Sequence, residues 1–266
     1  IEIDGNNAEA IIGAVNVAHA EKKRPTLIIG NTVMGLGCVK ADGSNFEGQC
    51  STHGQPLSKS GADYEATVRN LGADPANPWA IPAEVKELYA ARAEQLKAIC
   101  AARHAAEKAW AQENPQLAAE LNDFIAGKLP EIDWKEVAHK PGIATRQASA
   151  DCLSMLAEKV KNMIVASADL ANSDKTDAFL KKTTAFTKDD FSGAFFHAGV
   201  AELTMAAIMN GMALHGGVFA ACGTFFVFSD YMKPAVRMSA LMELPVKYIW
   251  THDAFRVGED GPTHEP

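Results

Sequence analysis

The second half of the chain alternates between segments of helical periodicity and short apolar runs typical of buried strands. The expected helices cover about 145–160, 199–215 and 229–244, and the expected strands cover 163–166, 218–225 and 246–251. Apolar runs of this kind are typical of parallel strands joined by crossover helices and buried on both faces. The start of the chain repeats the pattern, with a helix expected at 8–19 and a buried strand at 25–29. We therefore expect an α/β fold with two mostly parallel sheets flanked by helices.

A helical connector is expected between these two α/β parts. Residues 82–113 are dense in good helix formers, and Asn114 and Pro115 then supply a cap and a first-turn proline for another helix to about Ala126. The charges of this stretch are expected to form a solvated face. The segments 35–61 and 167–184 have no clear periodicity and are expected to be loops.

Composition excludes several classes of function. The chain has 25 basic and 33 acidic residues and a net charge of -8, which argues against a nucleic-acid partner. Its five cysteines form no C-x-x-C pair, which fits neither a disulfide framework nor a zinc site and favours a cytoplasmic location. There is no apolar run of membrane-spanning length and no signal peptide, so no membrane partner is expected. The strand-like start and the polar loop at the end predict an internal stretch of a longer protein.

Polar side chains follow two of the expected strands. Asp169 comes shortly after 163–166, and His252 comes directly after 246–251. Open parallel sheets bind ligands at the carboxyl ends of their strands, so these positions favour a binding site. Taken alone, each residue also has an ordinary structural explanation, such as helix capping for Asp169.

Other candidates are equally ambiguous when taken alone. Glu202, at the start of an expected helix, has the position of a capping or dipole-stabilising carboxylate. Phe225, Phe228 and Tyr231 have the i, i+3, i+6 spacing of a core stripe at a helix start. His53 lies in a glycine-rich loop, where packing gives no reason for a histidine.

Together, six segments resemble the transketolase family in order and spacing. They are 51–54 (STHG), 144–149 (ATRQAS), 167–170 (SADL), 199–202 (GVAE), 251–253 (THD) and 258–264 (GEDGPTH). The resemblance runs over essentially the whole chain, and the last segment is its most specific part. It implies two incomplete thiamine-diphosphate-binding-type α/β domains: residues 1–112 as the end of the diphosphate-binding domain, 113–140 as a helical connector, and 141–266 as the first part of the pyrimidine-binding domain.

The resemblance implies thiamine diphosphate as cofactor. Glu202 matches the family's glutamate that hydrogen-bonds the aminopyrimidine ring, a role that needs a desolvated carboxyl. The apolar residues expected to provide that environment are Phe196, Val200, Leu203 and Met205. The other residues implied at the cofactor are Phe225, Phe228, Tyr231, Asp169 and His53. Mg²⁺ or another divalent cation is also implied, with ligands expected upstream of Ile1 and none within this chain.

The resemblance also implies sugar phosphates as substrates. His53 and His252 match residues that act in proton transfer and hydroxyl recognition, and Asp260 matches another hydroxyl-binding position. Arg146, Ser173 and His264 resemble the group that grips the sugar phosphate. Arg256, in a segment that departs from the family pattern, is expected to be an exposed charge at the rim of the site.

The implied activity is transfer of a two-carbon ketol unit from xylulose 5-phosphate to ribose 5-phosphate or erythrose 4-phosphate in the pentose phosphate pathway. The implied assembly is a homodimer with active sites at the subunit interface. Two alternatives remain open: a dihydroxyacetone synthase-like enzyme with formaldehyde as acceptor, and a non-catalytic truncated module that dimerises with a complete enzyme. We expect this stretch alone to be inactive, because the metal ligands are absent from it.

Overall fold

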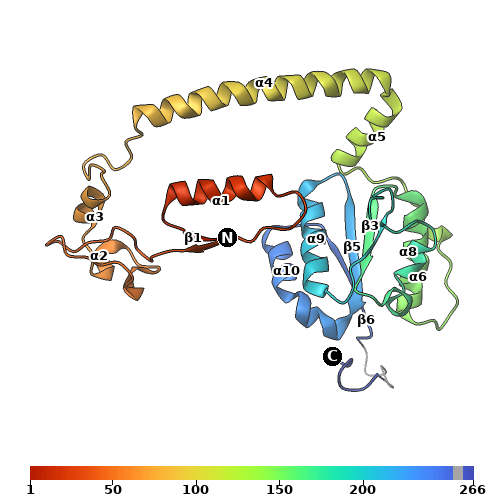
Figure 1. Ribbon diagram of the computed structural model, residues 1–266. Helices are drawn as coiled ribbons and strands as arrows, with labels where there is room; N and C mark the ends of the chain where they lie inside the picture. Colours follow the sequence, from red (N-terminus) through yellow and green to blue (C-terminus); the bar gives the residue numbers. More distant parts are fainter. Residues whose placement is uncertain (254–259) are drawn as a thin grey trace. The chain divides into compact units, whose positions relative to one another are not determined.

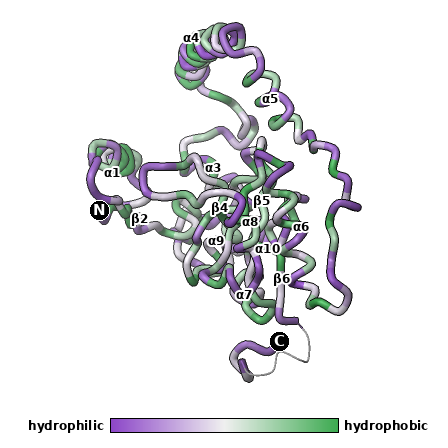
Figure 2. The backbone as a smooth tube through the Cα atoms, turned by 90° about the vertical axis from the view of Figure 1, so that its right-hand side faces the viewer, coloured by the Kyte–Doolittle hydropathy of each residue, from purple (hydrophilic) through white to green (hydrophobic). Residues whose placement is uncertain are grey.

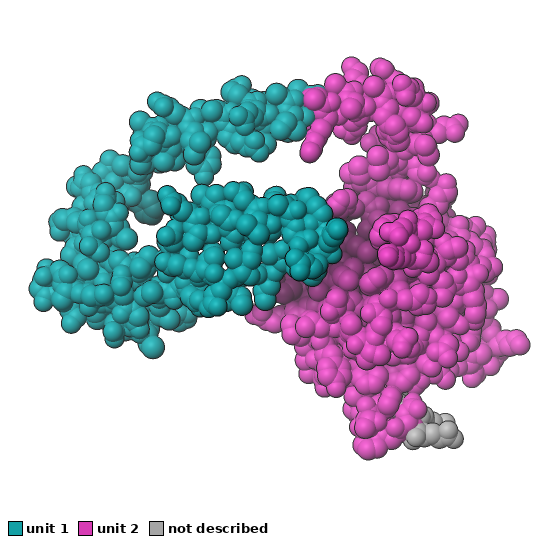
Figure 3. Space-filling model, in the orientation of Figure 1, with its two compact units in different colours: residues 1–101 teal, residues 102–266 magenta. Residues whose placement is uncertain are grey.

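The computed structural model describes residues 1–253 and 260–266. The expectation for Arg256, and the first two residues of the GEDGPTH segment, lie outside the described residues. The chain forms two compact units, 1–101 and 102–266 (Figure 3), and each is described here by itself. Within the described ranges, no helix combines the length and apolar character needed to cross a membrane.

The first unit opens with a small parallel βαβ arrangement. Strand β1 (Glu2–Asp4) pairs in parallel with β2 (Ile29–Asn31), and helix α1 (Ala8–Ala20) connects them. The side chain of Asn7 caps α1 by accepting a hydrogen bond from the backbone N–H of Ala10 at 3.1 Å. The buried strand expected at 25–29 is wrong in position and in burial. Its ladder starts only at Ile29, because β1 offers just three residues for pairing, and the Ile29 side chain is 50% exposed.

The polar segment after β2 is fastened by side-chain hydrogen bonds. It contains the 3-10 helix η1 (Cys50–Thr52) and the short helix α2 (Leu57–Ser60), and it leads into α3 (Tyr64–Asn70). From α3, Asn70 Nδ2 donates to the carbonyl of Gly37 at 2.9 Å. Gly37 has φ +80°, and a Cβ there would lie 2.5 Å from the Leu71 side chain, so only glycine fits.

Two helices follow, as the sequence predicts. Helix α4 (Ala83–Glu113) crosses the boundary between the units and has no buried residue, and Figure 2 shows hydrophilic and hydrophobic turns mixed along it. Helix α5 (Pro115–Ile125) begins at the predicted Asn114 cap and first-turn proline. The 3-10 helix η2 (Trp134–Glu136) then leads toward the second sheet.

The second unit is built on a four-stranded parallel sheet with the order β4-β3-β5-β6. Its strands are β3 (Met163–Ser167), β4 (Phe195–His197), β5 (Phe219–Phe225) and β6 (Lys247–Thr251). Its helices are α6 (Thr145–Lys159), α7 (Ala171–Asp174), α8 (Asp177–Leu180), α9 (Glu202–His215), the 3-10 helix η3 (Phe226–Phe228) and α10 (Ser229–Leu241). Helices α9 and α10 cover one face of the sheet, and α6 and α8 lie on the other (Figure 1).

The alternation of side chains along the strands supplies a core on each face. Ala166 of β3 packs in the cluster that includes Met205 and Met209 of α9, whereas its neighbour Val165 packs in the opposite cluster with Phe179. All five are essentially inaccessible to solvent. Burying a large apolar side chain contributes about 1.5–3 kcal/mol. The two clusters therefore determine which face of the sheet each strand side chain points to.

The predicted strands β3, β5 and β6 and the helices between them are confirmed to within a few residues. The prediction of an unbroken loop over 167–184 is wrong, because α7 and α8 lie there, and β4 was not predicted. These elements have only three or four residues, too few to show a period. Helix α9 begins at Glu202, three residues later than expected, because Gly199 takes a left-handed conformation (φ +70°).

Candidate functional site

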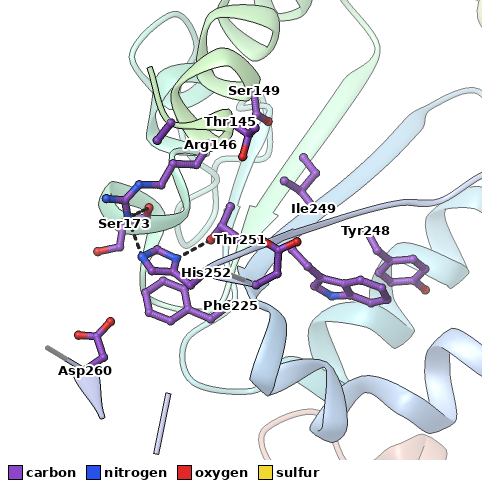
Figure 4. Close-up of a pocket in the computed structure, with 13 residues that line it drawn as sticks. Thr145, Arg146, Ser149, Ser173, Phe225, Tyr248, Ile249, Thr251, His252 and Asp260 are labelled. Atoms are coloured by element: carbon purple, nitrogen blue, oxygen red, sulfur yellow. Dashed lines mark hydrogen bonds between the residues drawn. The ribbon is translucent and has the colours of Figure 1, made fainter. Parts of the chain in front are cut away.

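A polar cavity of about 850 Å³ lies at the carboxyl ends of β5 and β6, beside the start of α6 (Figure 4). The residues that line it include Arg146, Ser149, Ser173, Phe225, Thr251, His252 and Asp260. Parallel pairing places Phe225 opposite Thr251, so the ends of the two strands converge on one edge of the sheet. The cavity therefore occupies the usual ligand position of an open parallel sheet.

Hydrogen bonds fix the tautomer of His252 in this cavity. Nη1 of Arg146 lies 2.6 Å from Nε2 of His252, and Oγ1 of Thr251 lies 2.8 Å from Nδ1 (Figure 4). Because a guanidinium can only donate, Nε2 must be the acceptor. The imidazole is then neutral and carries its proton on Nδ1, from which it donates to Thr251.

The electrostatics agree with a neutral imidazole. Burial lowers the pKa of His252 below its ordinary value of 6.5, and the positive charge of Arg146 lowers that pKa further. The carboxylates of Asp260 and Asp253 act in the opposite direction but do not reverse the shift. His252 can therefore exchange hydrogen bonds with an uncharged hydroxyl at neutral pH without carrying a charge itself.

The guanidinium of Arg146 is also held from a second side. Its Nη1 donates to the backbone carbonyl of Ser173, in α7, at 3.3 Å. Arg146 is the second residue of α6, whose N-terminal end carries partial positive charge. A half-buried guanidinium beside a helix N-terminus is a suitable anchor for a phosphate.

A second cavity, of about 510 Å³, surrounds the start of α9. It is lined by Ala168, Asp169, Leu170, Val200, Glu202, Phe228, Tyr231 and His264. Glu202 is buried, with 8% of its surface exposed, although it is the first residue of its helix. The rings of Phe228 and Tyr231 lie 6.2 Å apart and form an aromatic wall. A buried carboxyl facing aromatic rings suits a flat heterocycle with a ring nitrogen.

Phe225 links the two cavities. Its ring stacks on the imidazole of His252 with centroids 3.6 Å apart and planes at 23° (Figure 4). It also stacks on Phe228 at 5.9 Å and 13°. His264 contacts both phenyl rings edge-on, at 6.0 Å from Phe225 and 5.4 Å from Phe228.

The structure groups the predicted site residues in a way that the sequence did not show. Arg146, Ser173, His252 and Asp260 line the first cavity, whereas His264, expected beside Arg146 and Ser173, lines the second. The second cavity also receives Asp169, Glu202, Phe228 and Tyr231. His53 belongs to the other unit, where it is exposed and follows η1. Within the part of the chain that the structure describes, no group of three or more His, Cys, Asp or Glu side chains is placed to hold a metal ion.

Two expectations about local surroundings need correction. Phe225, Phe228 and Tyr231 are not a stripe at one helix start, because they lie at the end of β5, in η3 and in α10, and Tyr231 is 64% exposed. Of the apolar residues expected around Glu202, Met205 is buried, but Val200 is 78% and Leu203 is 46% exposed. Glu202 is therefore buried although both of these neighbouring side chains are exposed.

Sequence reasoning missed two residues that shape the first cavity. The hydroxyl oxygen of Thr251 accepts a hydrogen bond from Nδ1 of His252, and its position directly before a histidine at a strand end was the available signal. Asp174 is completely buried next to Ser173, and nothing in its sequence context indicated this.

Two family profiles match this chain. The one described as the thiamine diphosphate binding domain of transketolase matches residues 1–130, and the one described as the transketolase pyrimidine binding domain matches residues 141–266. The chain is 41% identical over 268 residues to the transketolase of Bacillus subtilis strain 168, in an alignment that covers 99% of this chain and 39% of the relative. The transketolase of Geobacillus stearothermophilus gives the same identity and coverage.

Solved structures give the same result. Transketolase from Leishmania mexicana superposes with a TM-score of 0.82 at 29% identity, covering 100% of this chain and 39% of that one. A transketolase from Pichia stipitis, solved in complex with sedoheptulose-7-phosphate, gives a TM-score of 0.80 at 33% identity and covers 100% of this chain and 40% of that one. The chain thus spans about two-fifths of the length of the curated relatives it matches. Its α/β architecture, its two matched domains and its relatives together establish that the chain belongs to the transketolase family.

Proposed function

We propose that the protein carrying this chain is a transketolase that transfers a two-carbon ketol unit from xylulose 5-phosphate to ribose 5-phosphate or erythrose 4-phosphate. The observation that carries this proposal is the pair of adjoining cavities joined by Phe225. One presents the buried carboxyl of Glu202 beside aromatic rings, and the other presents the guanidinium of Arg146 beside a neutral imidazole. The first suits a cofactor ring and the second suits a sugar phosphate.

The residues of the second cavity fit the pyrimidine half of thiamine diphosphate. Glu202 is buried, and among the described residues it makes no salt bridge that would occupy its carboxyl group. It would hold a proton against a ring nitrogen of the cofactor, while Phe225, Phe228 and Tyr231 would bound the ring. Asp169 would lie at the entrance of this cavity. When bound, the cofactor supplies a nucleophilic carbon and an electron sink for the two-carbon unit.

The residues of the first cavity fit the sugar phosphate. Arg146 would bind the phosphate, with Ser173 as a further contact, and His252 and Asp260 would bind sugar hydroxyls. The hydrogen bond from Arg146 to His252 would couple phosphate binding to hydroxyl binding. A phosphate that binds the guanidinium in place of His252 would leave Nε2 free to accept a hydrogen bond from a sugar hydroxyl. His53 would transfer a proton at the carbonyl oxygen of the substrate.

The assembly follows from the same proposal. Residues 1–112 would be the end of a diphosphate-binding domain, 113–140 a connector and 141–266 the first part of a pyrimidine-binding domain. A homodimer would place His53 of one subunit and Glu202 of the other in one site. The divalent cation, Mg²⁺ in the simplest case, would be held outside the described residues. The protein would act in the pentose phosphate pathway in the cytoplasm.

The test is a ketol-transfer assay on the full-length protein that carries this chain, supplied with thiamine diphosphate and Mg²⁺. Xylulose 5-phosphate serves as donor, and ribose 5-phosphate and formaldehyde serve as alternative acceptors. Faster transfer to ribose 5-phosphate would support the proposal, because Arg146 gives the acceptor site a phosphate anchor. Preference for formaldehyde would support the dihydroxyacetone synthase-like alternative, and no transfer to either acceptor would support the non-catalytic one.

A further inference from the structure

Asp174 is a completely buried carboxyl group with three hydrogen-bond donors around it. Oγ of Ser167, at the end of β3, donates to its Oδ2 at 2.8 Å. The backbone N–H and the hydroxyl of Thr176 donate to its Oδ1 at 2.9 Å and 2.7 Å. Burial raises the pKa of Asp174, and these three hydrogen bonds oppose that shift. Burial of a carboxyl group costs free energy, and the three hydrogen bonds to Asp174 offset part of that cost.

The same carboxyl group is packed against the neighbouring strand. A Cβ atom at Gly223 of β5 would lie 2.9 Å from Oδ2 of Asp174, so the strand reaches this oxygen only because residue 223 is glycine. Gly223 is the register partner of Ser167. Asp174 therefore fastens α7 to the ends of β3 and β5 together. Two residues after Gly223 comes Phe225, whose ring stacks on His252.

A second connection runs through the backbone of α7. The carbonyl of Ser173, the residue directly before Asp174, accepts a hydrogen bond from Nη1 of Arg146 at 3.3 Å. The N–H groups of Ser173 and Asp174 both donate to the carbonyl of Leu170, at 2.9 Å and 3.0 Å, which makes one rigid turn of this segment. The position of the carbonyl that holds Arg146 is thus set by the anchoring of Asp174.

Residues in a strained backbone conformation flank this turn on both sides. Asp169 and Lys175 have φ angles of +67° and +69°, in the left-handed region that residues with a side chain rarely adopt. Strained conformations of this kind persist only where the surrounding contacts determine them. The buried hydrogen bonds of Asp174, which directly precedes Lys175, are contacts of this kind.

We propose that Asp174 is a positioning residue for the phosphate end of the substrate site: it sets the guanidinium of Arg146 through the carbonyl of Ser173. This proposal rests on the proposed function for the identity of the bound group, a sugar phosphate. Asp174 does not line either cavity, so its effect on substrate passes through these neighbours.

The experiment compares two acceptors in the full-length enzyme with hydroxypyruvate as an unphosphorylated donor, so that only the acceptor carries a phosphate. The acceptors are ribose 5-phosphate and glycolaldehyde. For Asp174→Ala we expect KM for ribose 5-phosphate to rise about tenfold, with kcat/KM for glycolaldehyde changed less than about twofold. Asp174→Asn, which keeps the shape and one acceptor oxygen, is expected to recover most of the loss.

Controls separate positioning from simple destabilisation. Asp177→Asn removes a nearby carboxylate that pairs with Lys181, and we expect it to leave both acceptors unaffected. Ser167→Ala removes one donor to Asp174 from a well-packed strand, so it tests the proposal even if Asp174→Ala does not fold. It is expected to raise KM for ribose 5-phosphate a few-fold and to spare glycolaldehyde. Equal losses with both acceptors, or no loss with either, would overturn the proposal.

A measurement without catalysis distinguishes this proposal from the proposed function. The pKa of the His252 imidazole can be followed by NMR titration in the wild type, in Asp174→Ala and in Ser167→Ala. If the guanidinium of Arg146 moves away from the imidazole, its positive charge lowers the pKa of His252 less. We therefore expect both variants to raise this pKa. If the wild type transfers no ketol unit but this shift is present, the proposed function fails and the positioning role stands; an unchanged pKa contradicts the positioning role.

Discussion

Arg146 and His252 lie 106 residues apart in the chain, yet Nη1 of one is 2.6 Å from Nε2 of the other. The contact forces the imidazole into its neutral form and leaves the guanidinium partly engaged before any ligand binds. A phosphate that enters the cavity must therefore compete with His252 for Arg146. Recognition of the phosphate and the hydrogen-bonding state of the imidazole are coupled by this single contact.

Replacement of Arg146 by glutamine should weaken binding of phosphorylated acceptors selectively. A hydrogen bond to a charged group is worth about 1.5–3 kcal/mol, so kcat/KM for ribose 5-phosphate is expected to fall roughly 10- to 150-fold. The matched control is Arg24→Gln, which removes an exposed guanidinium that pairs with Glu21 alone among the described residues. A comparable loss with glycolaldehyde as acceptor would show that Arg146 does not act through the phosphate.

The depressed pKa of His252 predicts a pH dependence of stability. In the unfolded chain this histidine binds a proton near pH 6.5, whereas in the folded protein its pKa is lower. Between the two values the unfolded state holds more protons, so the stability of the fold decreases as the pH falls through this window. Urea unfolding at about pH 7 and about pH 5 measures the effect. His252→Gln should reduce this contribution, and a steeper loss of stability in acid for that variant would contradict the assigned protonation state.

Phe225 is expected to matter for both cavities at once. Phe225→Leu keeps an apolar side chain but removes ring stacking on His252 and Phe228, which is worth about 0.5–1.5 kcal/mol for each pair. We expect weaker binding of thiamine diphosphate together with a higher KM for the acceptor. Isothermal titration and steady-state kinetics measure the two effects. Phe191→Leu, at a side chain that is 80% exposed, is the control, and a change in only one of the two affinities would argue against Phe225 as the link.

Two glycines provide a pair of substitutions with opposite expected signs. Gly223→Ala would place a Cβ 2.6 Å from Cγ2 of Thr176, and such overpacking costs about 1–3 kcal/mol. Gly211→Ala meets nothing within 4 Å and lies inside α9, where alanine is favoured over glycine by about 0.5–1 kcal/mol. Tm should therefore fall for the first and rise for the second.

The close contact behind the first effect can be tested directly. Thr176→Ser removes the methyl group that the new Cβ would meet but keeps the hydroxyl that donates to Asp174. Added to Gly223→Ala, it should recover part of the lost stability. Simple addition of the two destabilisations would show that the contact is not the cause.

The sequence predicted the parts of this fold whose signal is local. The runs at β3 and β5 are apolar because both faces of those strands are buried, whereas the edge strand β6 is only partly buried. The helices between the strands show their own period. Strand β4 and helices α7 and α8 were missed because each has only three or four residues. Helix α7 ends at Asp174, whose buried hydrogen bonds no local pattern encodes.

The sequence named several residues that line the two cavities but did not show their geometry. Glu202, Arg146 and His252 were identified through family resemblance, yet their spacing in the sequence does not show that Arg146 meets His252. That contact depends on the parallel order of β5 and β6 and on α6 lying beside their ends. The sequence likewise did not show that His264 contacts the ring of Phe228.

The most direct test of the central claim is ketol transfer by the full-length enzyme with Glu202→Gln, compared with the wild type and with Glu131→Gln at an exposed loop position. Glutamine keeps the shape of residue 202 but cannot share a proton with a cofactor ring, so kcat should fall by about 10²–10⁴-fold in a folded protein. The control should retain wild-type activity. Wild-type kcat in Glu202→Gln would contradict the assignment of this cavity to thiamine diphosphate.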